Sequence, residues 1–187
     1  SPRMVLTPHA GVSQLLFSNV EEKELPGLAR KEDMLLSVDE NPRVKAIAKK
    51  SRSGIAEDGS VLKATKAVTL GESLFEVILH HFANDSRVIA YGEENRDWGG
   101  AFAVYQTLSE TVPYHRLFNS PISEAAIVGT AVGAAMEGAR PLVELMYCDF
   151  MGRAGDEVFN QMPKWQAMSA GILKLPIVLR VSVGAKY

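Results

Sequence analysis

Between residues 69 and 181 the sequence alternates between segments with helical spacing of apolar residues and short apolar runs. The helical segments are residues 69–84, 103–108, 123–138 and 155–169, and the short runs are residues 87–91, 117–119, 141–146 and 176–181. A short apolar run bounded by turn residues is typical of a strand that is buried on both faces, as strands are in parallel sheets. The alternation therefore predicts an α/β fold, in which helices cover both faces of a parallel sheet.

One predicted helix, residues 123–138, contains almost only small and apolar residues, and Ser123 is its predicted N-cap. Gly129 and Gly133, four residues apart, would let it press against a sheet or a symmetry mate, with almost no solvent face. Glu124 is the carboxylate in its first turn. It is either an exposed charge favoured by the helix dipole or a buried acid that binds a ligand nitrogen, and on general grounds the exposed charge is the more frequent case.

A loop rich in acids and glycines, residues 92–100, follows the predicted strand at 87–91. It would lie at the carboxyl end of that strand, where open α/β sheets usually bind their ligands. Its paired acids Glu93 and Glu94 are, taken alone, typical of a solvated loop.

The composition excludes several classes of partner. The 187 residues suffice for one full α/β domain with an appendage. Because 20 basic and 22 acidic residues are mixed along the chain, for a net charge of −2, we expect no nucleic-acid partner and no membrane partner. No apolar run approaches the length of a membrane span, and the single cysteine, Cys148, cannot form an internal disulfide, so a reducing, aqueous compartment is expected.

Residues 1–65 differ from the rest, because charged clusters alternate there with short apolar pieces. The pieces at residues 15–17 and 34–36 are too short to form a core of their own, so we expect residues 1–65 to be an arm or connector that docks on another domain or chain, or is partly disordered. Residues 66–187 would form the α/β domain. The chain begins with Ser-Pro-Arg and stops soon after a predicted strand, so we expect this domain to be truncated at its C-terminal end.

Several separated motifs of the predicted domain occur in a fixed order. They are Gly92-Glu93-Glu94, Pro121-Ile122-Ser123-Glu124, residues 131–138, Arg140-Pro141, Asn160-Gln161 with Lys164, and Met168-Ser169. With these motifs, the sequence from residue 69 to residue 180 resembles the β subunits of thiamine-diphosphate-dependent 2-oxo acid dehydrogenases, which include the pyruvate, branched-chain 2-oxo acid and acetoin enzymes. The resemblance implies a transketolase-like pyrimidine-binding domain. It does not cover residues 1–65, which would be the connector if α-like and β-like halves are fused in one chain.

For the site, the resemblance implies that Glu124 hydrogen-bonds a ring nitrogen of the cofactor's aminopyrimidine. A carboxyl that shares its proton with this nitrogen helps the cofactor to lose the proton of its thiazolium carbon, and a mostly apolar pocket would keep the carboxyl protonated near neutral pH. Ile122 and Phe150 match apolar and aromatic contacts of the same ring, and Met146 would support them; without the resemblance, Phe150 is typical of a core aromatic. Ile177 matches a position whose main-chain carbonyl binds a structural potassium ion.

The same resemblance implies a reaction and a set of partners. The complete protein would be an oxidoreductase that decarboxylates a 2-oxo acid and passes the acyl group to the lipoyl group of an acyltransferase. An α-like subunit or domain would bind the diphosphate and magnesium, and Gly129 and Gly133 fit a close contact between two β subunits in a homodimer or larger homo-oligomer. Glu93 and Glu94 match acids for subunit contact or proton communication between active sites. The compartment would be the bacterial cytoplasm, which we favour, or the mitochondrial matrix.

Two features of the family's complete site are not found in the sequence. The glycine-aspartate motif for diphosphate and magnesium is absent, and the family's acyl-transfer histidine is not matched by His9, His80, His81 or His115. We therefore expect this piece alone to be inactive, and Cys148 is interpreted as a small buried residue rather than a nucleophile. Two alternatives stay open: a transketolase-like or deoxyxylulose-phosphate-synthase-like enzyme, and a non-catalytic assembly domain of the same fold.

Overall fold

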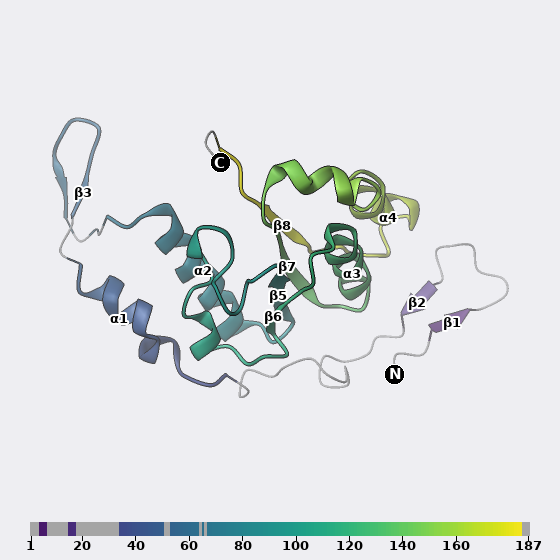
Figure 1. Ribbon diagram of the computed structural model, residues 1–187, viewed down its shortest axis with the longest axis horizontal. Coiled ribbons are helices and arrows are strands. Elements are labelled where there is room, and N and C mark those ends of the chain that lie inside the picture. Colours follow the sequence, from purple (N-terminus) through teal and green to yellow (C-terminus); the bar gives the residue numbers. More distant parts are fainter. Residues whose placement is uncertain are drawn as a thin grey trace.

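A four-stranded parallel sheet is the centre of the computed structural model, which describes residues 4–6, 15–17, 34–50, 53–63, 65 and 67–184 (Figure 1). The strand order is β6-β5-β7-β8. The strands are β5 (Val88–Gly92), β6 (Leu117–Asn119), β7 (Arg140–Leu145) and β8 (Val178–Val181). The predicted α/β fold with a parallel sheet is confirmed.

Two helices cover opposite faces of this sheet (Figure 1). On one face, α2 (Leu70–Asn84) buries Phe75 in a core that it shares with β5 and β6. On the other face, α3 (Glu124–Met136) buries Ile127 in a second core with Val143 of β7. Because alternate side chains of a strand point to opposite faces, the apolar strands supply both cores at once.

Shorter elements lie between these. After β5 come the 3₁₀ helices η5 (Ala101–Ala103) and η6 (Leu108–Glu110), and between β7 and β8 come the 3₁₀ helix η7 (Cys148–Ala154), the π-helical turn η8 (Glu157–Gln161) and α4 (Met162–Met168). The N-terminal part contains the antiparallel strands β1 (Met4–Leu6) and β2 (Leu15–Phe17), the 3₁₀ helix η4 (Val38–Glu40), α1 (Pro42–Ala48), and the antiparallel strands β3 (Gly54–Ile55) and β4 (Val61–Leu62). None of the helices in the described part of the chain is long and apolar enough to cross a membrane.

Part of the predicted arm packs directly on the α/β domain of the same chain. Ile47 of α1 is buried in the α2 core, and Met34 packs against that core. The Asn41 side chain is buried and donates hydrogen bonds to the Thr107 carbonyl (3.0 Å) and to Oγ1 of Thr111 (2.8 Å). The apolar piece at residues 34–36 therefore docks on this domain. The side chains of residues 15–17 lie outside what the structure describes, and the boundary at residue 65 stays a prediction.

Three details differ from the sequence predictions. Residues 103–108 are not a helix, because Ala103 and Thr107 have positive φ angles (54° and 71°) that a right-handed helix cannot contain. Ser123 is at the N-cap of α3, but its side chain makes no capping hydrogen bond. Finally, α3 does have a solvent face, since its exposed residues recur at helical spacing; they are Ala126, Thr130 and Gly133, followed by Glu137 at the C-cap.

Candidate functional site

The candidate site lies at the carboxyl ends of the strands. Gly92, the last residue of β5, pairs with Asn119, the last residue of β6. The N–H of Ser120 also donates to the Gly92 carbonyl (2.9 Å), so the two strands leave the sheet together. One continues into the loop that begins with Glu93, and the other turns into α3, which begins with Glu124. Both acids therefore start from the edge where open α/β sheets usually bind ligands.

Glu124 is a buried acid, with only 5% of its surface exposed. Its Oε2 atom lies 3.3 Å from Nε of Arg153 on η7, whose side chain is 76% exposed. Of the two sequence interpretations, the structure shows burial rather than an exposed helix-end charge. An arginine that is mostly in water compensates a buried carboxylate only in part, because water screens the attraction. What Glu124 binds stays a prediction.

A second acid, Glu93, lies close enough to Glu124 for the two charges to interact. Burial raises the pKa of Glu93, and the negative charge of Glu124 raises it further. The Oε1 atom of Glu93 is buried and has no hydrogen-bond partner among the described residues. Burial and the like charge of Glu124 therefore both favour the protonated form of the Glu93 carboxyl. Glu94, by contrast, is exposed in the loop.

The three apolar residues predicted for the site are all at least partly exposed. Phe150 is 40% exposed and lies three residues before Arg153 on η7, which packs against α3. Ile122 precedes the N-cap residue of α3 and is 81% exposed. Met146 follows the last residue of β7 and is partly buried. Phe150 is thus no core aromatic, and the contact of these three side chains with a ligand ring stays a prediction.

The remaining predicted positions do not join this group. Ile177 lies just before β8, at the amino end of the sheet, so the structure does not bring it together with Glu124. Cys148 is exposed at the start of η7, so the expectation of a small buried residue is wrong; the chain has left the sheet at this point. His80, His81 and His115 are exposed, and His9 lies outside the described residues.

The two interface glycines point in different directions. A Cβ atom on Gly129 would lie 3.5 Å from Cγ of Glu157, so this glycine lets α3 approach η8 within the chain. Nothing within the described residues lies near a Cβ at Gly133. The predicted pair on one face therefore divides into one internal packing position and one open position.

The loop that carries Glu93 is fixed at its far end by a buried ion pair. Oε1 of Glu144 accepts a hydrogen bond from the Ala101 N–H (2.6 Å), and Arg180 pairs with the same carboxylate while donating to the Ala101 carbonyl (3.1 Å). Burial raises the pKa of Glu144, and the charge of Arg180 limits that rise. A Cβ atom on Gly100 would lie 2.9 Å from Glu144, which explains the glycine there.

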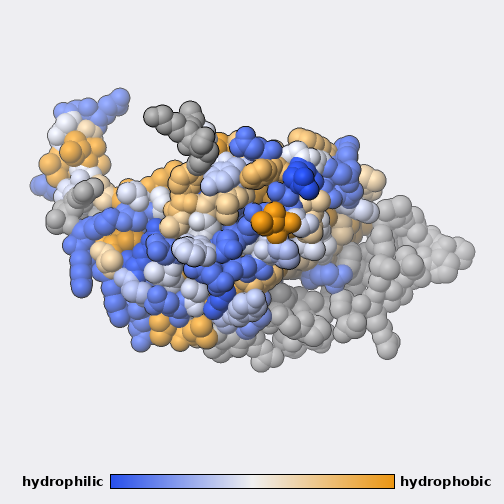
Figure 2. Space-filling model, viewed as in Figure 1, coloured by the Kyte–Doolittle hydropathy of each residue, from blue (hydrophilic) through white to orange (hydrophobic). Residues whose placement is uncertain are grey.

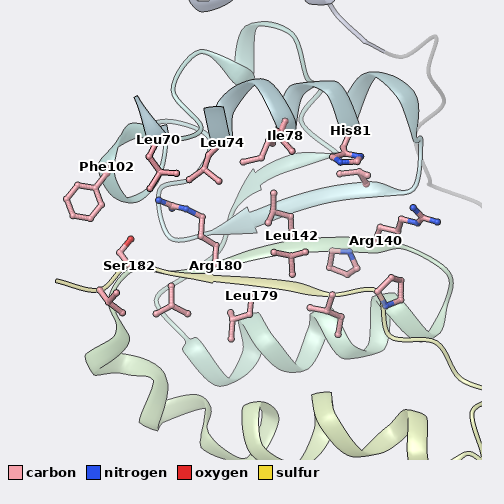
Figure 3. Close-up of a pocket in the computed structure, with 18 residues that line it drawn as sticks. Leu70, Leu74, Ile78, His81, Phe102, Arg140, Leu142, Leu179, Arg180 and Ser182 are labelled. Atoms are coloured by element: carbon pink, nitrogen blue, oxygen red, sulfur yellow. The ribbon is translucent and has the colours of Figure 1, made fainter. Parts of the chain in front are cut away.

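A separate apolar groove of about 870 Å³ lies between α2 and β8 (Figure 3). Leu70, Leu74 and Ile78 of α2 face Leu142 of β7 and Arg180 of β8 across it. Figure 2 shows hydrophobic residues, in orange, interspersed with hydrophilic ones, in blue, over the face of the molecule that is drawn. Because the groove is on the α2 face of the sheet and Glu124 is on the α3 face, the groove is not the site of the acid pair.

Sequence reasoning missed the partner of Glu124. Arg153 was not singled out, because its contact depends on η7 folding back onto α3, and no local pattern encodes that contact. The signal that the sequence does offer is a lone basic residue just before the predicted helix at 155–169. The motif residues Asn160 and Gln161 have a structural explanation instead, since both donate hydrogen bonds to Asp156 (2.7 and 2.8 Å) and so stabilise η8.

Comparison with known proteins gives one family. The model of the transketolase pyrimidine-binding domain matches residues 66–185. The β subunit of the acetoin:2,6-dichlorophenolindophenol oxidoreductase of Cupriavidus necator is 39% identical over 122 residues, which is 60% of this chain and 36% of that protein.

Two pyruvate dehydrogenase subunits are similarly related. The E1 component subunit beta of Rickettsia conorii is 38% identical over 118 residues, covering 63% of this chain and 36% of that protein. The mitochondrial E1 component subunit beta-2 of Oryza sativa is 37% identical over 122 residues, covering 65% and 32%. The match thus spans about a third of the length of each of these relatives.

Proposed function

The chain belongs to the transketolase pyrimidine-binding domain family, and from this premise we propose that it binds the aminopyrimidine of thiamine diphosphate in a 2-oxo acid dehydrogenase. The observation that carries the proposal is Glu124, a buried acid in the first turn of α3, at the carboxyl side of the sheet. The relatives, the β subunits of an acetoin oxidoreductase and of a pyruvate dehydrogenase, support the dehydrogenase class.

The residues present fit an aminopyrimidine ring. Such a ring needs an acid for its ring nitrogen, an aromatic or aliphatic surface for its flat face, and an open side through which to enter. Glu124 supplies the acid, Phe150 and Ile122 supply the exposed apolar surface, and Met146 borders it. The unpaired Oε1 of Glu93 is a further polar atom that lacks a partner in the described protein.

When bound, thiamine diphosphate supplies the electron sink that makes decarboxylation of a 2-oxo acid possible. The role of Glu124 is to hold a proton at the ring nitrogen of the pyrimidine. Phe150 and Ile122 orient the ring and keep water away from this proton. Glu93 opposes a second negative charge at the site and so favours the shared proton.

The other half of the cofactor would be bound elsewhere. Among the described residues, no group of His, Cys, Asp and Glu could hold a metal ion. We propose that an α-like subunit or domain binds the diphosphate through magnesium. The acyl group would then pass to a lipoyl-bearing acyltransferase. The complete protein would be a homo-oligomer, and this piece would be inactive alone. The Ile177 carbonyl is proposed as a potassium ligand. The bacterial cytoplasm is the favoured compartment, ahead of the mitochondrial matrix, and the relatives include bacterial and mitochondrial proteins.

The experiment is reduction of an artificial acceptor by the complete protein with thiamine diphosphate, magnesium and a panel of 2-oxo acids. Glu124→Gln keeps the shape of the side chain but removes its acid function, and we expect turnover to fall by about a hundredfold or more. Glu137→Gln is the matched control, because Glu137 is exposed at the opposite end of the same helix, and it should leave turnover unchanged.

Each outcome separates the proposal from its alternatives. Unimpaired turnover in Glu124→Gln would refute the role of this acid. Cofactor binding without turnover of any 2-oxo acid would favour a transketolase-like or deoxyxylulose-phosphate-synthase-like enzyme. A complete absence of cofactor binding would favour a non-catalytic assembly domain.

A further inference from the structure

The backbone is strained in and after the loop that carries Glu93. Four of the five non-glycine residues with a positive φ in the described part of the chain lie between residues 94 and 107. They are Glu94 (59°), Phe102 (58°), Ala103 (54°) and Thr107 (71°). Such conformations are costly for residues with a Cβ atom, persist only where the surrounding structure holds them, and cluster at functional sites. The contacts that hold this segment therefore point to its function.

An arginine of the N-terminal arm binds the carbonyl groups of the strained segment. Nη1 of Arg43, on α1, donates to the Ala103 carbonyl (2.7 Å). The same nitrogen lies 3.2 Å from the Val104 carbonyl oxygen and 3.4 Å from that of Gln106. The guanidinium also lies over the ring of the buried Phe75 of α2, 4.6 Å from the ring centroid. This cation–π contact orients the guanidinium, so the donor is fixed against the segment.

We propose that Arg43 is a positioning residue for the cofactor site: from the arm, it holds residues 102–107 in the conformation that fixes the loop carrying Glu93 at the carboxyl edge of the sheet. This inference rests on the proposed function, because the ligand of that edge is the proposed cofactor. It gives the arm a part in the site, which no relative's name implies.

Backbone hydrogen bonds continue from residues 103–106 into the loop. The Tyr105 N–H donates to the Gly99 carbonyl (2.8 Å). The next residue, Gly100, donates its N–H to the Glu94 carbonyl (3.1 Å). The stretch that Arg43 binds is thus connected, through two adjacent glycines, to the residue that follows the buried acid of the loop. A shift of this stretch is therefore transmitted to the loop.

Two other arginines hold the same region, but they belong to the domain itself. Arg96 donates to the Leu117 carbonyl (2.9 Å), and Arg180 donates to the Ala101 carbonyl (3.1 Å). Both lie within the part of the chain that the family model matches, whereas Arg43 lies outside it. The arm thus adds an anchor from outside the matched domain. Because the other two anchors stay in place, replacing Arg43 should loosen the loop without unfolding the domain.

The test combines hydrogen exchange with cofactor binding in the complete protein. Arg43→Met keeps an unbranched side chain over Phe75 but removes the donors, and Arg43→Lys keeps a positive charge that can donate. Ile47→Val is the matched control, because it trims a buried side chain of the same helix and leaves the guanidinium in place. Exchange followed by mass spectrometry reports on residues 93–107. Calorimetric titration with thiamine diphosphate and magnesium gives the dissociation constant, and acceptor reduction at saturating cofactor gives turnover.

We expect amides of residues 93–107 to exchange about tenfold or more faster in Arg43→Met, because a hydrogen bond from a charged donor is lost and local opening becomes easier. Amides of β5 should keep their protection. The dissociation constant of thiamine diphosphate should rise about tenfold, while turnover at saturating cofactor should fall by less than about twofold, since no reacting group is removed. Arg43→Lys should recover part of both effects, and Ile47→Val should show neither.

Three results would overturn the inference while leaving the proposed function intact. If Arg43→Met binds the cofactor as tightly as wild type, the site does not depend on the arm. If exchange rises throughout the domain, and affinity and turnover fall together in Arg43→Met and Ile47→Val alike, the arginine serves stability alone. If Arg43→Lys recovers none of the affinity, donation from this position is not the cause. Failure of wild type to bind thiamine diphosphate would instead refute the proposed function, and this inference with it.

Discussion

The replacement of Asn41 by alanine tests whether residues 34–50 are an integral part of the fold. The Asn41 side chain is completely buried. Its Oδ1 accepts hydrogen bonds from the backbone N–H groups of Arg43 (2.9 Å) and Val44 (3.3 Å), which caps α1. Its Nδ2 donates to the Thr107 carbonyl (3.0 Å) and to Thr111 (2.8 Å), which lie on the segment between β5 and β6.

The size of the effect follows from these contacts. Loss of the N-cap costs about 1 kcal/mol. Each of the two long-range hydrogen bonds contributes about 1 kcal/mol net, since the Thr107 carbonyl and the Thr111 hydroxyl would stay buried without their donor. We therefore expect the free energy of unfolding to fall by about 3 kcal/mol, or about 6–12 °C in the melting temperature for a chain of this size.

The assay is urea unfolding followed by circular dichroism, in which the midpoint should fall by about 1.5 M. Ser37→Ala is the matched control, because Ser37 is exposed at the N-cap position of η4 in the same segment and its hydroxyl donates to the Glu40 carboxylate (2.6 Å). We expect a loss below about 0.5 kcal/mol. Equal, small losses in the two variants would show that residues 34–50 rest on the domain without stabilising it, and the reasoning would be refuted.

Two further predictions concern the domain itself. Gly99 has a φ of +87°, and a Cβ atom there would lie 2.6 Å from the backbone nitrogen of Gln106. Gly99→Ala should therefore lower the free energy of unfolding by about 2 kcal/mol or more in the same assay. Gly133→Ala is the control: a Cβ atom at this helical position meets nothing among the described residues, so the substitution should raise the free energy of unfolding by about 0.5–1 kcal/mol. The hydrogen bond from Arg87 chiefly lowers the pKa of Asp85 below 3.8, so its stabilisation is present above that pH and is lost as the pH falls through the lowered value. Asp85→Asn should therefore flatten the acid limb of the unfolding free energy between about pH 5 and pH 2, and identical limbs would contradict this assignment.

Sequence patterns predict this fold because its strands and helices are locally encoded. The run at residues 87–91 became β5, shifted by one residue, and the helical spacing after Thr69 became α2, which begins with a capping box between Thr69 and Glu72. The helix predicted at residues 103–108 is not formed, and the reason is nonlocal. Their irregular backbone is stabilised from outside, since the Arg43 guanidinium donates to the Ala103 carbonyl (2.7 Å) across a sequence separation of 60 residues.

The same distinction applies to the site. Glu124 was singled out because a charge stands out at the start of a small-residue helix; that signal is local, and the structure shows the residue to be buried. Arg153 and the Glu144–Arg180 pair were missed because each contact joins elements that only the folded sheet brings together. The exposure of Cys148 was also mispredicted. The residue follows a buried strand in the sequence, and no local pattern shows that the chain has left the sheet and entered η7 at this point.

Stability alone gives no reason for an acid at position 124. A carboxylate that is 5% exposed loses most of its hydration, and the partner that the structure provides is a single arginine, which is itself mostly in water and therefore weakly attractive. An alanine at this position would continue the small-residue pattern of α3 without that cost. The neighbouring Glu93 increases the cost, because its buried Oε1 has no hydrogen-bond partner among the described residues and its charge has the same sign. Two costly acids beyond the carboxyl ends of β5 and β6 are what the proposed ligand, which brings a ring nitrogen to the site, would explain.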